Sequence, residues 1–290
     1  MNIEHIIISG GGPIFGLYAY GVLNKLQSGG KLDIDNVKTI CGCSSGAILG
    51  ALMCLKYDWN DLSEYIICRP WDKIVDISPE DLFRLPQDKG ILDRGFFEEI
   101  FNTLLQAKDL GVDTTLAGLY AYSGIDLHVY TAKVNSFEYV DMSHETHPDV
   151  KVIDAVYMSS AIPFIFKPVK HEDLHYADGA IIRNYPFDNF RKAHISAPED
   201  TILGIYLGWA DEVASCNELS LLDYALFIYR NQLNLLDRQE HDTKYSVRIL
   251  LTVSELTEFV SVFKNSSMRD EIINKKSLKF VEQLLSCDNT

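Results

Sequence analysis

The 290-residue chain has little positive charge: 26 lysines and arginines stand against 41 aspartates and glutamates, for a formal net charge of -15 at pH 7. Proteins that bind nucleic acids rely on lysine and arginine to neutralise phosphates, so this balance argues against a nucleic-acid partner. The same charge disfavours standing adsorption to anionic lipid. A local apolar patch would still allow transient contact with a membrane surface.

Long hydrophobic runs are also missing. The longest stretch of apolar residues and glycine, 46–55, is about half of what spans a membrane. Residues 1–5 contain no basic segment of the kind that begins a signal peptide. The six cysteines match neither a disulfide framework nor the spacing of a zinc site. We therefore expect a cytoplasmic protein with free thiols and no transmembrane segment.

The remaining composition is that of an ordinary globular protein, with 47% hydrophobic residues and no tract biased enough to form a linker. Strand-like and helix-like segments alternate, which indicates one α/β domain over residues 1–290. Strands are predicted at 5–9, 37–41, 125–134, 137–140, 166–169, 174–177, 202–209 and 246–253. Helices are predicted at 17–26, 47–55, 152–161, 219–237 and 269–285. Residues 57–120 form a less regular helical insertion that either covers a site or packs on the sheet, and the aromatic content favours packing.

The run Gly42-Cys43-Ser44-Ser45-Gly46 stands between a β-branched strand and a helix of small residues. Gly42 and Gly46 leave room for a tight turn that projects Ser44 outward, with the N-terminus of a helix behind it. A serine on such a turn is a candidate nucleophile for acyl transfer. The alternative is a glycine-rich turn with an ordinary serine.

Three successive glycines, Gly10, Gly11 and Gly12, follow the first predicted strand. Their spacing to Gly16 is one residue too long for a dinucleotide fingerprint, and no lysine completes a phosphate-binding P-loop. The first strand-helix-strand unit predicts parallel strands, which places this loop and Ser44 at the same edge of the sheet. The loop amides are therefore candidates for an oxyanion hole that faces Ser44.

A nucleophilic serine needs a base, and histidine is the usual one. The order Ser, Asp/Glu, His would require a late histidine, but His194 and His241 lie in polar segments without a distinctive flank. We take all eight histidines as surface residues or as core residues with satisfied hydrogen bonds. Asp178 ends a predicted strand and precedes Gly179, so it is the other candidate base; the alternative is a simple Asp-Gly turn.

Four ordered motifs together resemble the patatin-like phospholipase family over residues 5–190. They are Ser9-Gly10-Gly11-Gly12, Gly42-Cys43-Ser44-Ser45-Gly46, Ser159-Ser160-Ala161-Ile162-Pro163 with Pro168-Val169, and Asp178-Gly179-Ala180. The resemblance implies a patatin-type three-layer α/β/α sandwich with a mostly parallel central sheet, which residues 200–290 complete. It also implies a lipid acyl hydrolase that needs no metal or cofactor and acts on phospholipids or other acyl esters.

Carried over to this sequence, the family pattern makes Ser44 the nucleophile and Asp178 the base of a Ser-Asp dyad. The amides of Gly10, Gly11 and Gly12 become the oxyanion hole, while Gly42, Gly46, Gly179 and Ala180 shape the two motifs. One departure is visible, because Pro13-Ile14-Phe15 stands where the family has a basic residue before the next glycine. The loop is therefore predicted to be one residue longer.

Two alternatives to this function stay open. The altered glycine loop suits a catalytically impaired, lipid-binding or regulatory member of the same fold. A Ser-His-Asp esterase of the α/β-hydrolase type is the other reading, and it would need one of the late histidines.

Overall fold

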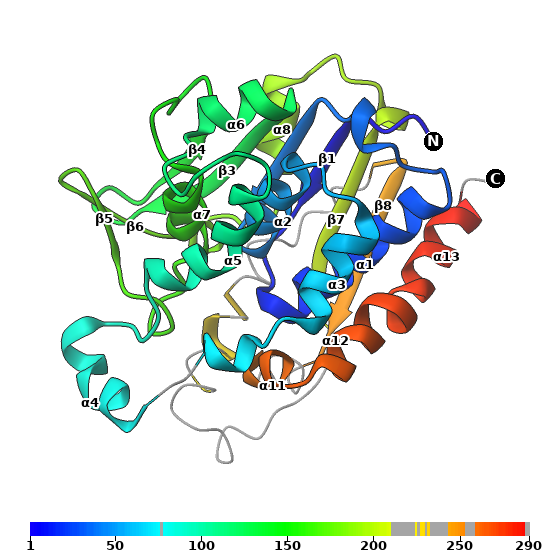
Figure 1. Cartoon of the computed structure of the whole chain (residues 1–290). Helices are drawn as coiled ribbons and strands as arrows, with labels where there is room; N and C mark the ends of the chain where they lie inside the picture. Colours follow the sequence, from blue (N-terminus) through cyan, green and yellow to red (C-terminus); the bar gives the residue numbers. More distant parts are fainter. Residues whose placement is uncertain are drawn as a thin grey trace.

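The computed structural model describes residues 1–75, 78–209, 243–252 and 259–287, together with 224, 227–229, 231 and 232. Within these residues one eight-stranded sheet runs through the molecule (Figure 1). The strands are β1 (His5–Ile8), β2 (Thr39–Cys43), β3 (Asp126–Lys133), β4 (Glu138–Met142), β5 (Val169–His171), β6 (Leu174–Asp178), β7 (Ile202–Trp209) and β8 (Tyr245–Leu251).

Helices lie on both faces of this sheet. They are α1 (Gly12–Ser28), α2 (Ser45–Cys54), α3 (Trp59–Cys68), α4 (Pro79–Asp88), α5 (Arg94–Gln106), α6 (Leu116–Ser123), α7 (Val152–Ser160), α8 (Phe187–Ala193), α11 (Phe259–Lys264), α12 (Ser266–Glu271) and α13 (Leu278–Cys287). Short 3-10 turns are η1 (Ile34–Asn36), η2 (Trp71–Lys73), η3 (Gly179–Ile181) and η4 (Glu199–Thr201), and η6 (Ile272–Lys276) is a π-helical turn.

The sheet has a parallel centre and an antiparallel side. The strand order is β5-β6-β3-β2-β1-β7-β8, with β4 on the other side of β3. The five strands β3-β2-β1-β7-β8 are parallel to their neighbours in this order. Strands β4 and β6 are antiparallel to β3, and β5 is antiparallel to β6. The central strand β1, His-Ile-Ile-Ile, is buried along its whole length, as expected for a parallel strand covered on both faces.

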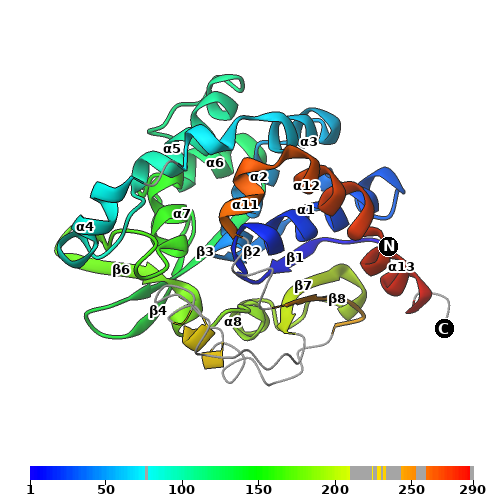
Figure 2. The same ribbon diagram turned by 90° about the horizontal axis from the view of Figure 1, so that it is seen from below.

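The two covering layers are unequal (Figure 2). Helices α1, α2 and α7 lie on one face, with α3, α5 and α6 outside them, and α8 lies on the opposite face. The larger face holds most of the hydrophobic core, while a smaller cluster around Tyr130, Phe187 and Phe190 fills the α8 face. The predicted α/β fold with a central sheet and flanking helices is confirmed.

Helix α2 lies very close to the sheet, as its small residues predicted. A Cβ atom on Gly46 would come within 2.3 Å of the Ile8 carbonyl oxygen, and one on Gly42 within 2.5 Å of the Gly46 carbonyl. Only glycine allows these two backbone approaches, which bring the start of α2 over the ends of β1 and β2.

Several predicted boundaries were wrong. Helix α1 begins at Gly12 rather than Leu17, because proline at the first helical positions is favourable and Pro13 takes that place. Strand β2 begins two residues later than predicted and continues to Cys43. Strand β5 begins only at Val169, where the prediction placed its last residue.

The C-terminal part of the chain also departs from the prediction. The helix expected at 269–285 is interrupted by the π-helical turn η6. There α1 approaches so closely that a Cβ on Gly21 would lie 2.7 Å from the Ile273 carbonyl oxygen. Most of the helix predicted at 219–237 falls outside the described residues, and so do His241 and Cys216.

The insertion 57–120 consists of α3 to α6. Its side chains Trp71, Phe97 and Phe101 are buried in the main core, whereas Phe83 on α4 is 86% exposed. Packing on the sheet therefore describes most of this segment, as predicted. No helix in the described part of the chain is both long and apolar enough to cross a membrane.

Candidate active site

Ser44 occupies the sharp turn between β2 and α2. Its backbone has φ +53° and ψ -122°, a strained conformation for a residue with a side chain. Ser44 is the N-cap residue of α2, but its hydroxyl makes no capping hydrogen bond. The hydroxyl thus stays available for chemistry at the positive end of a ten-residue helix, where developing negative charge is favoured.

The register of β3 brings Asp178 to the same place. The last residue of β2, Cys43, pairs with Tyr130 of β3, and Asp178 at the end of β6 pairs with the next residue, Thr131. Because β2 runs parallel and β6 antiparallel to β3, their carboxyl ends meet along one strand. Ser44 and Asp178 are 134 positions apart in sequence, yet they lie at these two adjacent strand ends.

Asp178 is deeply buried, with 1% of its surface exposed. Its Oδ1 accepts a 2.8 Å hydrogen bond from the Ala180 amide. Oδ2 has no hydrogen-bond partner among the described residues. Burial raises the pKa of Asp178 to about 7, although the Ser44 hydroxyl and the Ala180 amide both favour the charged form. The result is a carboxylate whose proton affinity suits a general base at neutral pH.

The C-terminal end of α7 and its C-cap residue hold both residues in position. Ser159 accepts a 2.9 Å hydrogen bond from the Ser44 amide and donates a 2.6 Å bond to the Tyr130 carbonyl. Two residues later, the Ala161 carbonyl accepts a 3.0 Å bond from the Asp178 amide. The Ser159-Ser160-Ala161 motif therefore fixes the backbones of Ser44 and Asp178 from one side.

The glycine loop is the third component, and it lies against Ser44 as the parallel topology predicted. A Cβ atom on Gly10 would come within 2.8 Å of the Ser44 Cβ. The Gly10 amide donates a 2.9 Å hydrogen bond to Oδ1 of Asn184. The amides of Gly11 and Gly12 have no acceptor among the described residues, because they stand at the N-terminus of α1. They are the two amides at this end of the loop that lack an acceptor within the described part of the chain.

The glycine loop is shorter than the predicted helix start at Leu17 implied. Pro13, Ile14, Phe15 and Gly16 belong to the first turns of α1, so the loop ends at Gly11. Phe15 is fully buried, and its side chain lies under Gly11, where a Cβ would be only 2.5 Å from the Phe15 ring. An apolar side chain thus supports the loop from below at the position near which the family carries a basic residue.

An apolar cavity of about 130 Å³ opens next to this site. It lies between α1, α2, α3, α5 and α11. Pro13, which follows the glycine loop, and Ser45, which follows Ser44, line the part of the cavity nearest the site. Other side chains of its wall are Ile48, Leu49, Trp71, Phe96 and Phe263. Its size is close to that of the engineered cavity of about 150 Å³ that takes up benzene.

Arg269 contributes the charged side chain of this wall. Its guanidinium donates hydrogen bonds of 2.6 to 3.1 Å to the carbonyls of Ile67, Arg69, Val262 and Phe263. These carbonyls lie at the C-terminal ends of α3 and α11, where a positive charge is favourable. With every N–H group bonded to main chain, Arg269 joins two walls of the cavity without placing an unsatisfied charge in it.

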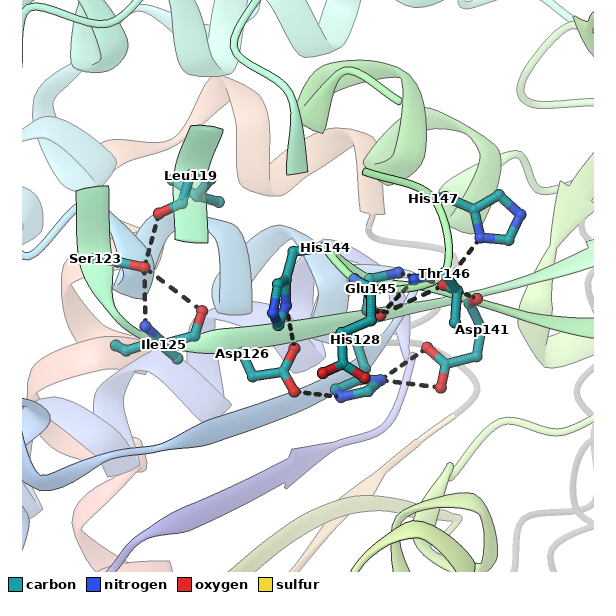
Figure 3. A network of polar contacts seen from close by, with 11 residues as sticks. Leu119, Ser123, Ile125, Asp126, His128, Asp141, His144, Glu145, Thr146 and His147 are labelled. Atoms are coloured by element: carbon teal, nitrogen blue, oxygen red, sulfur yellow. Dashed lines mark hydrogen bonds and ion pairs between the residues drawn. The ribbon is translucent and has the colours of Figure 1, made fainter. Parts of the chain in front are cut away.

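His128 and His144 belong to a separate network of polar contacts. His128 is held between two carboxylates, with Nε2 3.0 Å from Asp126 and Nδ1 2.9 Å from Asp141, and His144 contacts the other oxygen of Asp126 at 2.9 Å (Figure 3). Burial alone would lower the pKa of His128, but hydrogen bonds to the two aspartates outweigh it and raise the pKa to about 10. Asp126 is level with Thr39 at the start of β2, whereas Asp141 pairs with Tyr130, so this network runs along β3.

Among the described residues no histidine hydrogen bonds to Ser44 or Asp178, and no group of three or more His, Cys, Asp or Glu side chains could hold a metal ion. Asn184 is the residue of this site that the sequence reasoning missed. Its only sequence signal is an amide side chain in the short stretch between Asp178 and Pro186, which is too weak to identify a contact with a loop 174 positions away.

The chain therefore has an α/β fold in which a strained serine turn and a buried aspartate meet at one edge of the central sheet. The family model described as patatin-like phospholipase matches residues 6–191, more than half of the sequence. The chain belongs to the patatin-like phospholipase family.

Among individual proteins, the chain is similar to "Probable lipid hydrolase 463L" of Invertebrate iridescent virus 6, with 25% identity over 65% of this chain and 63% of that protein. It is 29% identical to "Triacylglycerol lipase ptl3" of Schizosaccharomyces pombe over 56% of this chain and 33% of the lipase. The chain thus matches less than two thirds of the length of these relatives. The crystal structure of VipD from Legionella pneumophila shares the fold, with a TM-score of 0.54 and 15% identity over 98% of this chain and 67% of VipD.

Proposed function

We propose that this protein is a lipid acyl hydrolase that cleaves carboxylic esters with a Ser44-Asp178 dyad. The observation that carries the proposal is the meeting of a strained, uncapped serine with a buried carboxylate whose Oδ2 is unbonded. A serine hydroxyl needs a base to become nucleophilic. Asp178, with its pKa raised to about 7, can accept that proton near neutral pH.

In the proposed reaction Ser44 Oγ attacks the ester carbonyl carbon while its proton passes to Oδ2 of Asp178. The negative charge that develops on the carbonyl oxygen is stabilised by the Gly11 and Gly12 amides and by the N-terminus of α2. The tetrahedral species collapses when the alcohol leaves with the proton from Asp178. Water then attacks the acyl-enzyme and gives one proton to Asp178. The second tetrahedral species collapses as Ser44 Oγ leaves with that proton, which releases the fatty acid and restores the dyad.

The cavity beside Ser45 is evidence that the substrate carries an acyl chain. Its wall is apolar, and the guanidinium of Arg269 is fully bonded to carbonyls. Burial of each methylene group contributes about 0.8 kcal/mol, so a segment of acyl chain would bind there while its carbonyl reaches Ser44. Phospholipid and neutral lipid esters both offer this group.

The decisive test compares wild type with Ser44→Ala and Asp178→Asn on p-nitrophenyl acyl esters and on mixed lipid vesicles, with products analysed by mass spectrometry. Both variants should stay folded by circular dichroism and lose at least 10³-fold in turnover, because each removes a group on which formation of the acyl-enzyme depends. Near-native turnover by either folded variant would refute the dyad.

A fluorophosphonate probe separates this function from that of a lipid-binding protein without turnover. An activated serine reacts with the probe, whereas an ordinary serine does not. Labelling of wild type at Ser44, and its absence in Ser44→Ala, supports the hydrolase. An unlabelled wild-type protein that still takes up fatty acid would favour the lipid-binding alternative.

A further inference from the structure

Asn184 links the two ends of the site. It lies between the turn that follows Asp178 and helix α8, and only 1% of its surface is exposed. Its side-chain carbonyl accepts a 2.9 Å hydrogen bond from the Gly10 amide, and its Nδ2 donates a 3.1 Å bond to the Gly10 carbonyl. One carboxamide therefore satisfies both main-chain polar groups of a buried glycine.

Gly10 is wedged between Asn184 and the nucleophile. A Cβ atom at Gly10 would lie 2.7 Å from Oδ1 of Asn184 and 2.8 Å from the Ser44 Cβ. The position of the Asn184 carboxamide thus determines how closely the glycine loop approaches Ser44. Because the Gly10 N–H is taken by Asn184, the donors left for an oxyanion are the next two amides, Gly11 and Gly12.

The same short segment also carries the base. The Asp178 carboxylate is held by the Ala180 amide, and the Arg183 carbonyl lies 3.8 Å from Sγ of Cys43, the residue before Ser44. Residues 178–184 therefore contact the nucleophile turn and the glycine loop while they hold the aspartate. None of the hydrogen bonds found for Asp178, to the Ala180 amide and the Ala161 carbonyl, involves the Asn184 side chain.

We propose that Asn184 is a positioning residue that sets the oxyanion-hole amides of the glycine loop against Ser44. This inference rests on the proposed hydrolase function. A side chain in this role must donate and accept hydrogen bonds at once, which a carboxamide does and an ionised carboxylate cannot. Hydrogen-bond donors must lie within a few tenths of an ångström of their best position to stabilise an oxyanion. Loss of the two Asn184–Gly10 hydrogen bonds should therefore lower kcat more than it changes KM.

The test uses Asn184→Ala and measures both kinetics and the loop itself. We expect kcat to fall about 10²-fold, as when an oxyanion donor is lost, with KM changed less than threefold. Hydrogen exchange of peptides covering residues 9–16 should become faster. Asn24→Ala is the matched control, because Asn24 is also buried and hydrogen bonded, but to Ser63 on α3. It should lower the melting temperature and leave kcat within twofold.

Asn184→Asp keeps the shape of the side chain and gives a second readout. It can be measured even if the alanine variant does not fold. A protonated carboxyl donates and accepts like the carboxamide, whereas an ionised one repels the Gly10 carbonyl. The pH profile of kcat for Asn184→Asp should therefore gain a falling limb at high pH that wild type lacks. A purely structural role would produce no such limb.

The outcomes are distinct. Unchanged exchange of residues 9–16 in the folded variants, a loss confined to KM, or kcat within threefold of an active wild type would each overturn the positioning role. If wild type itself hydrolyses no ester, the proposed function fails, and the exchange measurement still decides whether Asn184 holds the loop.

Discussion

The buried carboxyl of Asp178 should make the protein less stable as the pH rises toward neutrality, and Asp178→Asn should remove this effect. Burial raises the pKa of Asp178 from 3.8 to about 7 in the folded chain. Below pH 3.8 the carboxyl is protonated in the folded and the unfolded chain, so it contributes nothing. Between pH 3.8 and 7 only the unfolded chain releases the proton, and the free energy of unfolding falls with rising pH.

The magnitude follows from the shift. Each pH unit between the two pKa values is worth about 1.4 kcal/mol, so the full penalty above pH 7 is roughly 4 kcal/mol. Asp178→Asn keeps the oxygen that accepts the Ala180 amide and replaces Oδ2 with an NH2 group. That buried NH2 group adds a constant cost of about 1–3 kcal/mol if it finds no partner. The change between two pH values is therefore the informative quantity.

Urea unfolding of wild type and Asp178→Asn at pH 5 and pH 8 measures this change in the free energy of unfolding. Relative to wild type, the free energy of unfolding of Asp178→Asn should increase by about 2–3 kcal/mol from pH 5 to pH 8. Ser44→Ala should lose more stability than wild type between pH 5 and pH 8, because the Ser44 hydroxyl lowers the pKa of Asp178. Asp173→Asn, which alters a fully exposed carboxylate, serves as the control and should follow wild type.

An equal difference between wild type and Asp178→Asn at both pH values would refute the reasoning. The folded protein would then hold Asp178 with an ordinary proton affinity, and a carboxylate of that kind is too weak a base for a serine nucleophile near neutral pH. The stability experiment thus tests the proposed base without any substrate.

Two further predictions concern activity. The pH profile of kcat/KM should rise with a midpoint near pH 7 to a plateau, because only deprotonated Asp178 can accept the Ser44 proton; a profile that is flat from pH 5 to 9 would contradict this. Ile48→Trp should fill the cavity beside Ser45 and reduce kcat/KM at least tenfold for a p-nitrophenyl ester of an eight-carbon acid while sparing the acetate. Equal losses on both esters would show that the acyl chain binds elsewhere.

Much of this site could be predicted from local sequence because its parts are backbone features. Gly42 and Gly46 stand where a Cβ would collide with main chain, so the turn around Ser44 is visible as a glycine pattern next to a strand. The parallel topology follows from a strand-helix-strand unit, and it correctly placed the glycine loop beside Ser44. The start of α1 at Gly12 was missed because Gly10–Gly16 resembled a loop, although Pro13 is a helix-start signal.

Other features depend on contacts between distant segments, and local patterns do not encode them. The approach of Asp178 to Ser44 arises from the antiparallel pairing of β6 with β3 directly beyond the end of β2. The high proton affinity of Asp178 comes from burial under other parts of the chain, and the hold of Asn184 on Gly10 joins residues 174 positions apart. The sequence therefore identifies which groups are present and which turns present them, whereas distance and desolvation, which set reactivity, exist only once the sheet has assembled.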